Sequence, residues 1–292
     1  MDTGHVGVWH PLLSKAPVQQ VRRAAAEIEE LGYGALWGNE APGSKEPFVN
    51  AALLLAATER AAVGIGIASI WGRDATATAA AWATLAEAFP GRFLLGLGVS
   101  HSPLVSGRGH TYIKPLAAMR AYLDGIDAAK PEVPQGDAPR LLAALKPKML
   151  ELSRDRAEGA HTYFVPPEHT ALARQILGPD RLLVPEQAVV VETDPARARE
   201  IARTYMSYYL VLPNYLNNLR DLGFTDDDFA DGGSDRLVDA IVAWGDAEAV
   251  AGRVRDHLAA GADHVAIQPL SPLPDLDDAL AQLKTLAPAL GL

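Results

Sequence analysis

Short apolar runs alternate along the chain with longer segments in which apolar residues recur every three or four positions. Residues 5–9 read as a strand, and residues 18–31 show the helical spacing before they end at Gly32. The same alternation continues toward the C-terminus. The predicted strands are residues 5–9, 35–37, 62–70, 92–97, 140–145, 159–164, 182–192 and 263–268. Eight strands, each followed by helix, predict an α/β protein with a (β/α)8 TIM barrel, and we expect residues 1–292 to form a single domain.

Two stretches interrupt this alternation. Residues 102–112 contain glycines and Pro103, so we expect an irregular segment in the position of a lid. Residues 210–244 are expected to form a helical insertion in the seventh unit, with its last helix over residues 234–244. The alternative fold is an open doubly wound sheet, but the Gly-x-Gly-x-x-Gly turn typical of that fold is missing after the first strand.

The fourth strand ends in a glycine-rich stretch. Residues 92–101 read Arg-Phe-Leu-Leu-Gly-Leu-Gly-Val-Ser-His. An apolar run of this kind suits a strand that is covered on both faces, as in a parallel sheet. Gly96 and Gly98 remove side chains where either another backbone or a flat ligand approaches closely, and the sequence leaves both explanations open.

In a (β/α)8 barrel the active site lies at the C-terminal ends of the strands, so the residues there are candidates for one shared site. They are Trp9 and His10, Asn39 and Glu40, Ser69 and Trp71, Val99, Ser100 and His101, Ala143, Ala144 and Lys146, and His161 and Tyr163. Apolar walls with a few polar groups suit a flat heteroaromatic cofactor, whose ring edges can bond to backbone amides.

Other chemistries find less support in the residues. The chain has no cysteine, which removes disulfides, thiolate nucleophiles and cysteine-bound metals. Neither a His-x-His nor a His-Glu-x-x-His motif occurs, so no metal site is predicted. A Gly-x-Ser-x-Gly motif is also missing, which argues against acyl transfer.

Charge and hydropathy limit the partners and the compartment. The net charge of −10 comes from 36 acidic and 26 basic residues without a long run of either sign, so we expect no nucleic-acid partner. Residues 1–5 lack the pattern of a signal peptide, and no apolar run reaches the roughly 20 residues that span a bilayer. We therefore expect a cytoplasmic protein without a membrane partner.

Four segments carry a family resemblance: residues 29–37, 90–101, 142–152 and 261–265. Together they resemble the luciferase-like monooxygenase superfamily, and within it the actinobacterial oxidoreductases that use the deazaflavin coenzyme F420. The resemblance extends over nearly the whole chain. It implies coenzyme F420 as the cofactor, with FMN as the alternative, and a homodimer as the assembly.

The resemblance also implies positions for the site. Family members often carry a non-prolyl cis peptide in a bulge of strand three, against which the cofactor rests, and the matching bond is Gly66–Ile67. In deazaflavin dehydrogenases a polar residue and a histidine follow strand two, and these positions are Asn39 and Glu40 here. An acidic residue after strand four falls on His101. In this chain the histidine and the acidic residue are exchanged between the two positions. Either Glu40 or His101 is therefore the expected proton donor.

The tail of the cofactor is bound in relatives by small residues after strand five, where this chain has Ala143, Ala144 and Lys146 but lacks the usual glycines. The cofactor-binding residues expected in total are Asn39, Gly66, Ile67, Gly98, Val99, Ser100, Ala143, Ala144, Lys146, Gly159 and His161. Trp9, His10 and Trp71 are expected to face the substrate.

These expectations combine into one leading function. It is an oxidoreductase that transfers a hydride between coenzyme F420 and a small organic substrate. The alternatives are an FMN-dependent monooxygenase, a non-catalytic flavin- or deazaflavin-binding protein, and an unrelated barrel hydrolase or isomerase.

Overall fold

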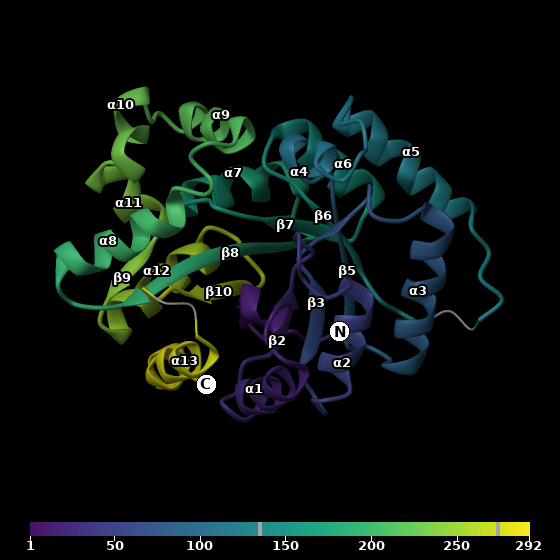
Figure 1. The fold of residues 1–292 in the computed structure, drawn as a ribbon, viewed down its shortest axis with the longest axis horizontal. Helices are drawn as coiled ribbons and strands as arrows, with labels where there is room; N and C mark the ends of the chain where they lie inside the picture. Colours follow the sequence, from purple (N-terminus) through teal and green to yellow (C-terminus); the bar gives the residue numbers. More distant parts are fainter. Residues whose placement is uncertain (134–135, 273–274) are drawn as a thin grey trace.

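The computed structural model describes residues 1–133, 136–272 and 275–292, and it confirms the predicted (β/α)8 barrel (Figure 1). The barrel strands are β1 (Val6–Trp9), β2 (Ala35–Gly38), β3 (Ala62–Ile65), β5 (Phe93–Gly98), β6 (Arg140–Ala143), β7 (Gly159–Thr162), β8 (Leu182–Val191) and β10 (Val265–Pro269). They pair in parallel, and the ring closes where β10 pairs with both β8 and β1. Their C-terminal ends therefore meet at one end of the barrel, which we call the mouth.

Helices cover the outside of the barrel (Figure 1). They are α1 (Val18–Glu30), α2 (Pro47–Leu55), α3 (Ala75–Ala88), α5 (Pro115–Ala128), α6 (Pro147–Arg156), α7 (Pro167–Leu177), α12 (Ala247–Ala259) and α13 (Leu276–Leu290). Local signals start several of them: proline opens α2, α5, α6 and α7, and the Asp74 side chain caps α3 by accepting from the Ala77 amide at 2.7 Å.

Large aromatic rings occupy part of the barrel interior. Trp37 on β2 stacks on His161 of β7, with ring centroids 5.3 Å apart. The neighbouring strand β3 makes room for the Trp37 ring, because a Cβ on Gly64 would lie 2.2 Å from it.

The third strand differs from the sequence prediction. The single strand expected over residues 62–70 is split into β3 and β4 (Ala68–Ser69), which pairs with β5. The peptide Gly66–Ile67 between them is cis, as the family resemblance implied. A Cβ on Gly96 would lie 1.9 Å from the Ile65 carbonyl oxygen, and one on Gly98 would lie 2.4 Å from Ile67 Cδ1. Gly96 therefore makes room for the backbone of β3, and Gly98 makes room for the Ile67 side chain. Of the two explanations left open by the sequence, close packing of neighbouring protein atoms accounts for both glycines.

The segment between β8 and α12 forms a second layer beside the mouth, at the upper left of Figure 1. It contains α8 (Pro195–Met206), α9 (Pro213–Asp221), α10 (Asp226–Phe229), the short 3-10 helix η2 (Ala230–Gly232), α11 (Asp235–Ile241) and β9 (Ala243–Gly245). The helix predicted over residues 234–244 is therefore wrong at its end. β8 extends beyond the barrel, so its last residues would have a free edge without β9. β9 pairs along that edge, with Trp244 opposite Val190.

A short helix also lies in the stretch expected to be irregular. Residues 102–112, which we call the lid segment, begin with α4 (Ser102–Ser106), with Pro103 in its first turn. A second short element, the 3-10 helix η1 (Pro11–Leu13), follows β1 and is capped by the His10 side chain.

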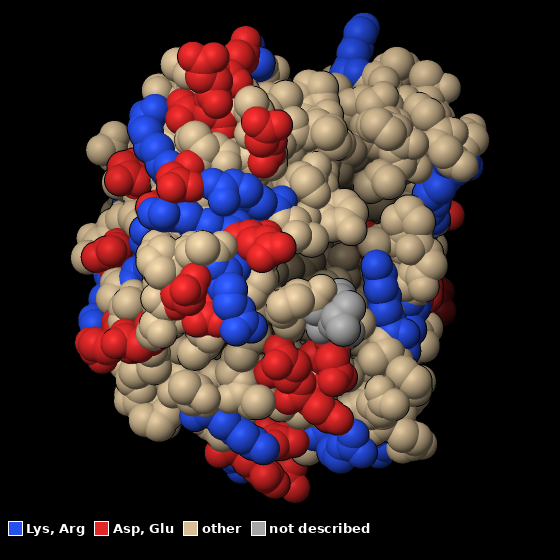
Figure 2. All heavy atoms as spheres, turned by 60° about the vertical axis from the view of Figure 1, so that its left-hand side comes forward, with Lys and Arg blue, Asp and Glu red and all other residues tan. Residues whose placement is uncertain are grey.

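Charged side chains of both signs are interspersed on the face that carries the insertion (Figure 2). Ion pairs within the insertion show the same mixing, since Arg199 of α8 binds Asp235 at 2.9 Å and Asp239 at 2.6 Å on α11. None of the helices in the described part of the chain is long and apolar enough to cross a bilayer.

Candidate active site

The cis peptide lies at the mouth and is held by backbone and indole hydrogen bonds. Trp9 Nε1 donates to the Gly66 carbonyl oxygen at 2.9 Å, and the Glu40 amide donates to the Ile67 carbonyl oxygen at 3.2 Å. The ends of β1 and β2 therefore fix the bulge in place. Beside it, two buried acceptor positions, Asn39 Oδ1 and His161 Nε2, have no hydrogen-bond partner among the described residues.

His161 lies beneath the bulge. Its Nδ1 is 2.8 Å from the Val184 carbonyl oxygen, which can only accept, so Nδ1 carries the proton and Nε2 is left with a free lone pair. Burial lowers the pKa of His161 to about 4, so the ring is neutral at pH 7. A Cβ on Gly66 would lie 3.2 Å from Nε2, which shows how close this acceptor comes to the bulge.

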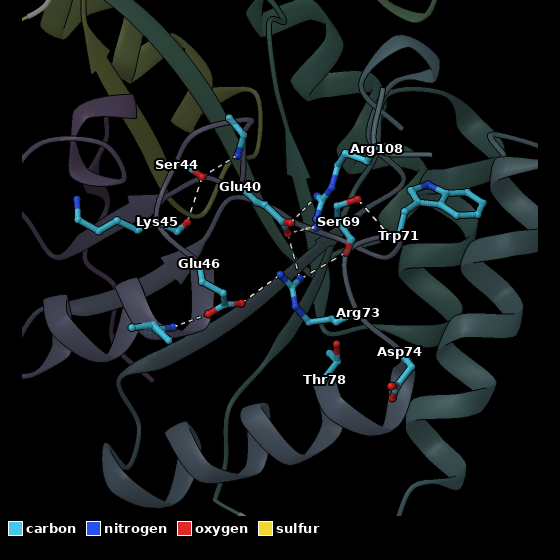
Figure 3. Close-up of polar contacts among 12 residues, drawn as sticks. Glu40, Ser44, Lys45, Glu46, Ser69, Trp71, Arg73, Asp74, Thr78 and Arg108 are labelled. Atoms are coloured by element: carbon cyan, nitrogen blue, oxygen red, sulfur yellow. Dashed lines mark hydrogen bonds and ion pairs between the residues drawn. The ribbon is translucent and has the colours of Figure 1, made fainter. Parts of the chain in front are cut away.

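Glu40 is held between two arginines (Figure 3). Arg108 of the lid segment binds one carboxylate oxygen at 2.9 Å, and Arg73 binds the other at 3.0 Å. The Ser69 amide donates to the same carboxylate at 2.9 Å. Burial by itself would raise the pKa of Glu40, but these hydrogen bonds together lower it. Glu40 is therefore an ionised, fully engaged carboxylate that links the lid segment to the ends of β2 and β4.

The lid segment closes this part of the mouth. A cavity of about 20 Å³ remains between it and the barrel, lined by Glu40, Ser69, Trp71, Ser100 and Arg108 among others. Trp71 is fixed by a 2.8 Å bond from its Nε1 to the Val99 carbonyl oxygen. Ser100 has a φ of 56°, a left-handed conformation uncommon for a residue with a side chain.

His101 follows Ser100 and faces the insertion. Its ring is 5.5 Å from the ring of Tyr215 on α9, and Asn214 hydrogen-bonds to its side chain. Burial lowers the pKa of His101, with the Asn214 bond acting in the opposite direction. His101 and Glu40 both lie at the mouth, but among the described residues His101 has no charged partner like the arginines that bind Glu40.

Sequence analysis named Tyr163 but missed the other members of a group of residues on the other side of the mouth. Glu186 on β8 and Gln268 on β10 point into the barrel, and five rings from β7 and the insertion pack beside them. The rings are Tyr163, Phe164, Tyr205, Tyr209 and Tyr215, and we call them the aromatic cluster. The available signal was the pair Glu186-Gln187 within an otherwise apolar strand. A carboxyl in such a strand is unusual unless it is paired or functional.

Several other predicted site residues lie elsewhere. Ala144 packs with Leu150 in a core cluster under the helices. Lys146 occupies the N-cap position of α6, and its side chain binds Asp221 and the Asn217 carbonyl oxygen of α9. His10 is buried at the start of η1, and burial lowers its pKa to about 4.

Gly159 stands at the first position of β7, at the end of the barrel opposite the mouth. A Cβ there would lie 2.1 Å from the Leu182 carbonyl oxygen, so close packing of β8 explains this glycine. We therefore remove Gly159 from the candidate site.

The chemistry of the bulge fits a flavin or deazaflavin. Such a ring system carries N–H and C=O groups on its edges, and the two free acceptors beside the cis peptide can pair with its donors. Within residues 1–133, 136–272 and 275–292 no group of three or more His, Asp or Glu side chains could hold a metal ion.

Comparisons with known proteins agree with this fold. A model of the luciferase-like monooxygenase family matches residues 1–264. A 5,10-methylenetetrahydromethanopterin reductase of Methanolobus tindarius is 27% identical over 161 residues, which cover 49% of this chain and 49% of the relative. A protein of Mycobacterium tuberculosis, provisionally named a coenzyme F420-dependent oxidoreductase, is 35% identical over 109 residues, 37% of this chain and 31% of the relative. The matches thus span half or less of these curated relatives.

A solved structure matches a larger share of this chain than the sequence relatives do. An F420-dependent secondary alcohol dehydrogenase in complex with an F420–acetone adduct superposes with a TM-score of 0.75 at 14% identity, over 99% of both chains. At this identity the likeness concerns the fold. Because the family model matches most of the chain and the barrel carries the expected bulge, the chain belongs to the luciferase-like monooxygenase family.

Proposed function

We propose that this protein is an oxidoreductase that binds coenzyme F420 at the Gly66–Ile67 bulge and acts on a small organic substrate. The observation that carries the proposal is the pair of buried, unpartnered acceptors, Asn39 Oδ1 and His161 Nε2, beside the cis peptide. One sequence relative and one structural neighbour carry F420 in their names, which supports F420, while another neighbour is in complex with FMN, which stays the alternative. When bound, the deazaflavin would supply hydride exchange with a carbon of the substrate.

The chain's own residues would bind, orient and handle the proton. Trp9 and Trp71 would form apolar walls, with the backbone of Val99 and Ser100 at the opposite edge. We assign the proton to an imidazole nitrogen of His101, because imidazole can act as a proton acceptor or, once protonated, as a donor, and burial lowers the pKa of this ring. Glu40 is already bonded to two arginines and serves to hold the lid segment.

A ligand that contacts Glu40, Trp71 and Ser100 would require the lid segment to move. The cavity of about 20 Å³ is far smaller than the roughly 300 Å³ at which ligand pockets begin. An anionic tail on the cofactor would meet Ala143 and Lys146 next, and its phosphate would compete with Asp221 for the lysine. As the family resemblance implies, we further propose a homodimer in the cytoplasm.

Titration of the purified protein with F420 and with FMN tests the cofactor assignment. We expect saturable quenching of F420 fluorescence and binding at least tenfold tighter than that of FMN. Preferential FMN binding would instead favour a monooxygenase. Binding of F420 would favour a non-catalytic carrier if no alcohol in a broad panel reduces the bound cofactor and no ketone or enone in the panel oxidises its reduced form.

His101→Ala should lower turnover by about 10²- to 10⁴-fold, the range typical for loss of a general acid or base, while F420 affinity stays within about twofold. The measurement is oxidation of reduced F420 with a substrate from the same panel, beside fluorescence titration of the cofactor. His110→Ala is the matched control, since this exposed histidine lies in the same lid segment. Equal turnover in wild type and His101→Ala would remove His101 from the chemistry.

A further inference from the structure

Glu186 occupies the inner face of the barrel at its mouth. Val184, two residues earlier on β8, packs in the barrel interior with Trp9 and Ala266, and alternate residues of a strand share one face. Gln187 points the opposite way and binds His257 of α12. The Glu186 carboxyl is 1% exposed, and it accepts the Phe164 amide at 3.3 Å and contacts the Tyr205 hydroxyl at 3.4 Å.

Tyr163 is the member of the aromatic cluster nearest to the bulge. Its ring lies 5.2 Å from Trp9, whose indole bonds to the Gly66 carbonyl oxygen. The Tyr163 hydroxyl donates to Gln268 Oε1 at 2.8 Å and lies 2.8 Å from the Tyr209 hydroxyl. The Tyr163 side chain is partly exposed, whereas Glu186 is sealed behind it.

The hydrogen-bond donors in this network run in one direction. Because the single proton of Tyr163 goes to Gln268, Tyr209 must donate to Tyr163. Tyr205 packs against Tyr209, with ring centroids 5.0 Å apart. Burial raises the pKa of Glu186 to about 8, so at pH 7 its hydroxyl can donate to Tyr205 and free that phenol to donate onward. The network therefore delivers a donor to the mouth at Tyr163.

We propose that Tyr163 donates a hydrogen bond to the oxygen atom of an alcohol or carbonyl substrate, taking that oxygen in place of Gln268, and that Glu186 is a positioning residue which orients the Tyr163 hydroxyl. The proposal rests on the oxidoreductase function proposed above and extends it to the substrate class. An oxygen that gains negative charge would be held most strongly, since a hydrogen bond to a charged acceptor is worth more than one to a neutral acceptor.

The titratable groups that face Glu186 are phenols from each element packed against it. They are Tyr163 after β7, Tyr205 on α8, Tyr209 after α8 and Tyr215 on α9. Above the pKa of Glu186, its carboxylate can only accept, which turns the Tyr205 hydroxyl inward and weakens the outward donor chain.

Pentafluorophenolate, an aromatic oxyanion that stays ionised over the whole pH range tested, serves as the probe. Its binding to wild type, Tyr163→Phe, Glu186→Gln and Tyr208→Phe is followed by fluorine NMR on the protein without cofactor. We expect Tyr163→Phe to weaken binding by about 10- to 100-fold, the loss of one hydrogen bond to a charged group. Tyr208→Phe, at a tyrosine that is 71% exposed, should stay within twofold of wild type.

The pH profile separates positioning from a merely structural role. Wild-type affinity should fall above about pH 8, whereas Glu186→Gln, which keeps an uncharged donor, should bind about as well as wild type at pH 7 and show no such fall. Absence of saturable binding to wild type, or equal binding by Tyr163→Phe with a native circular dichroism spectrum, would overturn the proposal. The proposal would also be overturned if the affinity for pentafluorophenolate had the same pH profile in wild type and Glu186→Gln. Because no cofactor is present, failure here is distinct from a failure of F420 binding.

Discussion

Gly96→Ala is expected to destabilise the fold by about 3 kcal/mol or more, the upper part of the range for overpacking a well-filled core. The added Cβ would lie 1.9 Å from the Ile65 carbonyl oxygen and 3.3 Å from Ile67 Cγ2. The first of these atoms belongs to the backbone of β3, so it cannot swing aside like the end of a flexible side chain. β3 and β5 would have to separate at the point where they frame the bulge. The measurement is the free energy of unfolding from denaturant titration, with melting temperature as a second readout.

Gly252→Ala is the matched control. Gly252 lies inside α12, and the nearest atom to its added Cβ is Arg255 Nη2 at 3.8 Å. Alanine is favoured over glycine in a helix interior, so this variant should gain about 0.5–1 kcal/mol. A stability loss below about 1 kcal/mol in Gly96→Ala would contradict the close approach of β3 and β5.

Glu186→Gln should stabilise the protein at neutral pH, by about 3 kcal/mol at pH 7. The pKa of Glu186 rises from its ordinary 4.5 to about 8 on folding because the carboxyl is buried. Between these two values the folded state holds a proton that the unfolded state has lost, so wild-type stability falls by about 1.4 kcal/mol per pH unit as pH rises through this window. A glutamine side chain accepts the Phe164 amide and donates to Tyr205 without this cost.

The difference between Glu186→Gln and wild type should therefore vanish near pH 4, grow with pH and level off above about pH 8. Unfolding free energies at one-unit intervals from pH 4 to 9 measure it. The exposed residue Glu30 on α1 provides the control, because Glu30→Gln should track wild type across the range. A gain that is constant with pH would mean that Glu186 is ionised in the folded protein.

The barrel could be predicted from the sequence because local sequence signals mark each strand and helix. Alternation of apolar runs with helical spacing gave eight strands, and signals such as Asp74 and Pro147 marked where helices begin. The failures occurred where distant contacts override local preference. Residues 243–245 continue a helical stretch in the sequence but form β9, because the free edge of β8 lies beside them.

The site was only partly predictable for the same reason. The rule that strand ends converge located Trp9, Glu40, Trp71 and His101 at the mouth. It could not foresee that Arg108, far along the chain, would engage Glu40. Nor could it connect Tyr163, which follows β7, with Glu186 of β8 and Gln268 of β10 in one network that includes tyrosines of the insertion.

By itself, the sequence determined the order of the eight barrel strands and of the helices that cover them, the end of the barrel that carries the candidate site, and the place of the cis peptide. These depend on residue types and spacings that act within a few positions of the chain or match a family pattern. Tertiary structure decided the ionisation of Glu40 and Glu186, the role of the glycines in β5 and the membership of the aromatic cluster. Burial and hydrogen bonding set a pKa, and close approach sets the need for glycine, so both depend on which distant segments the fold brings together.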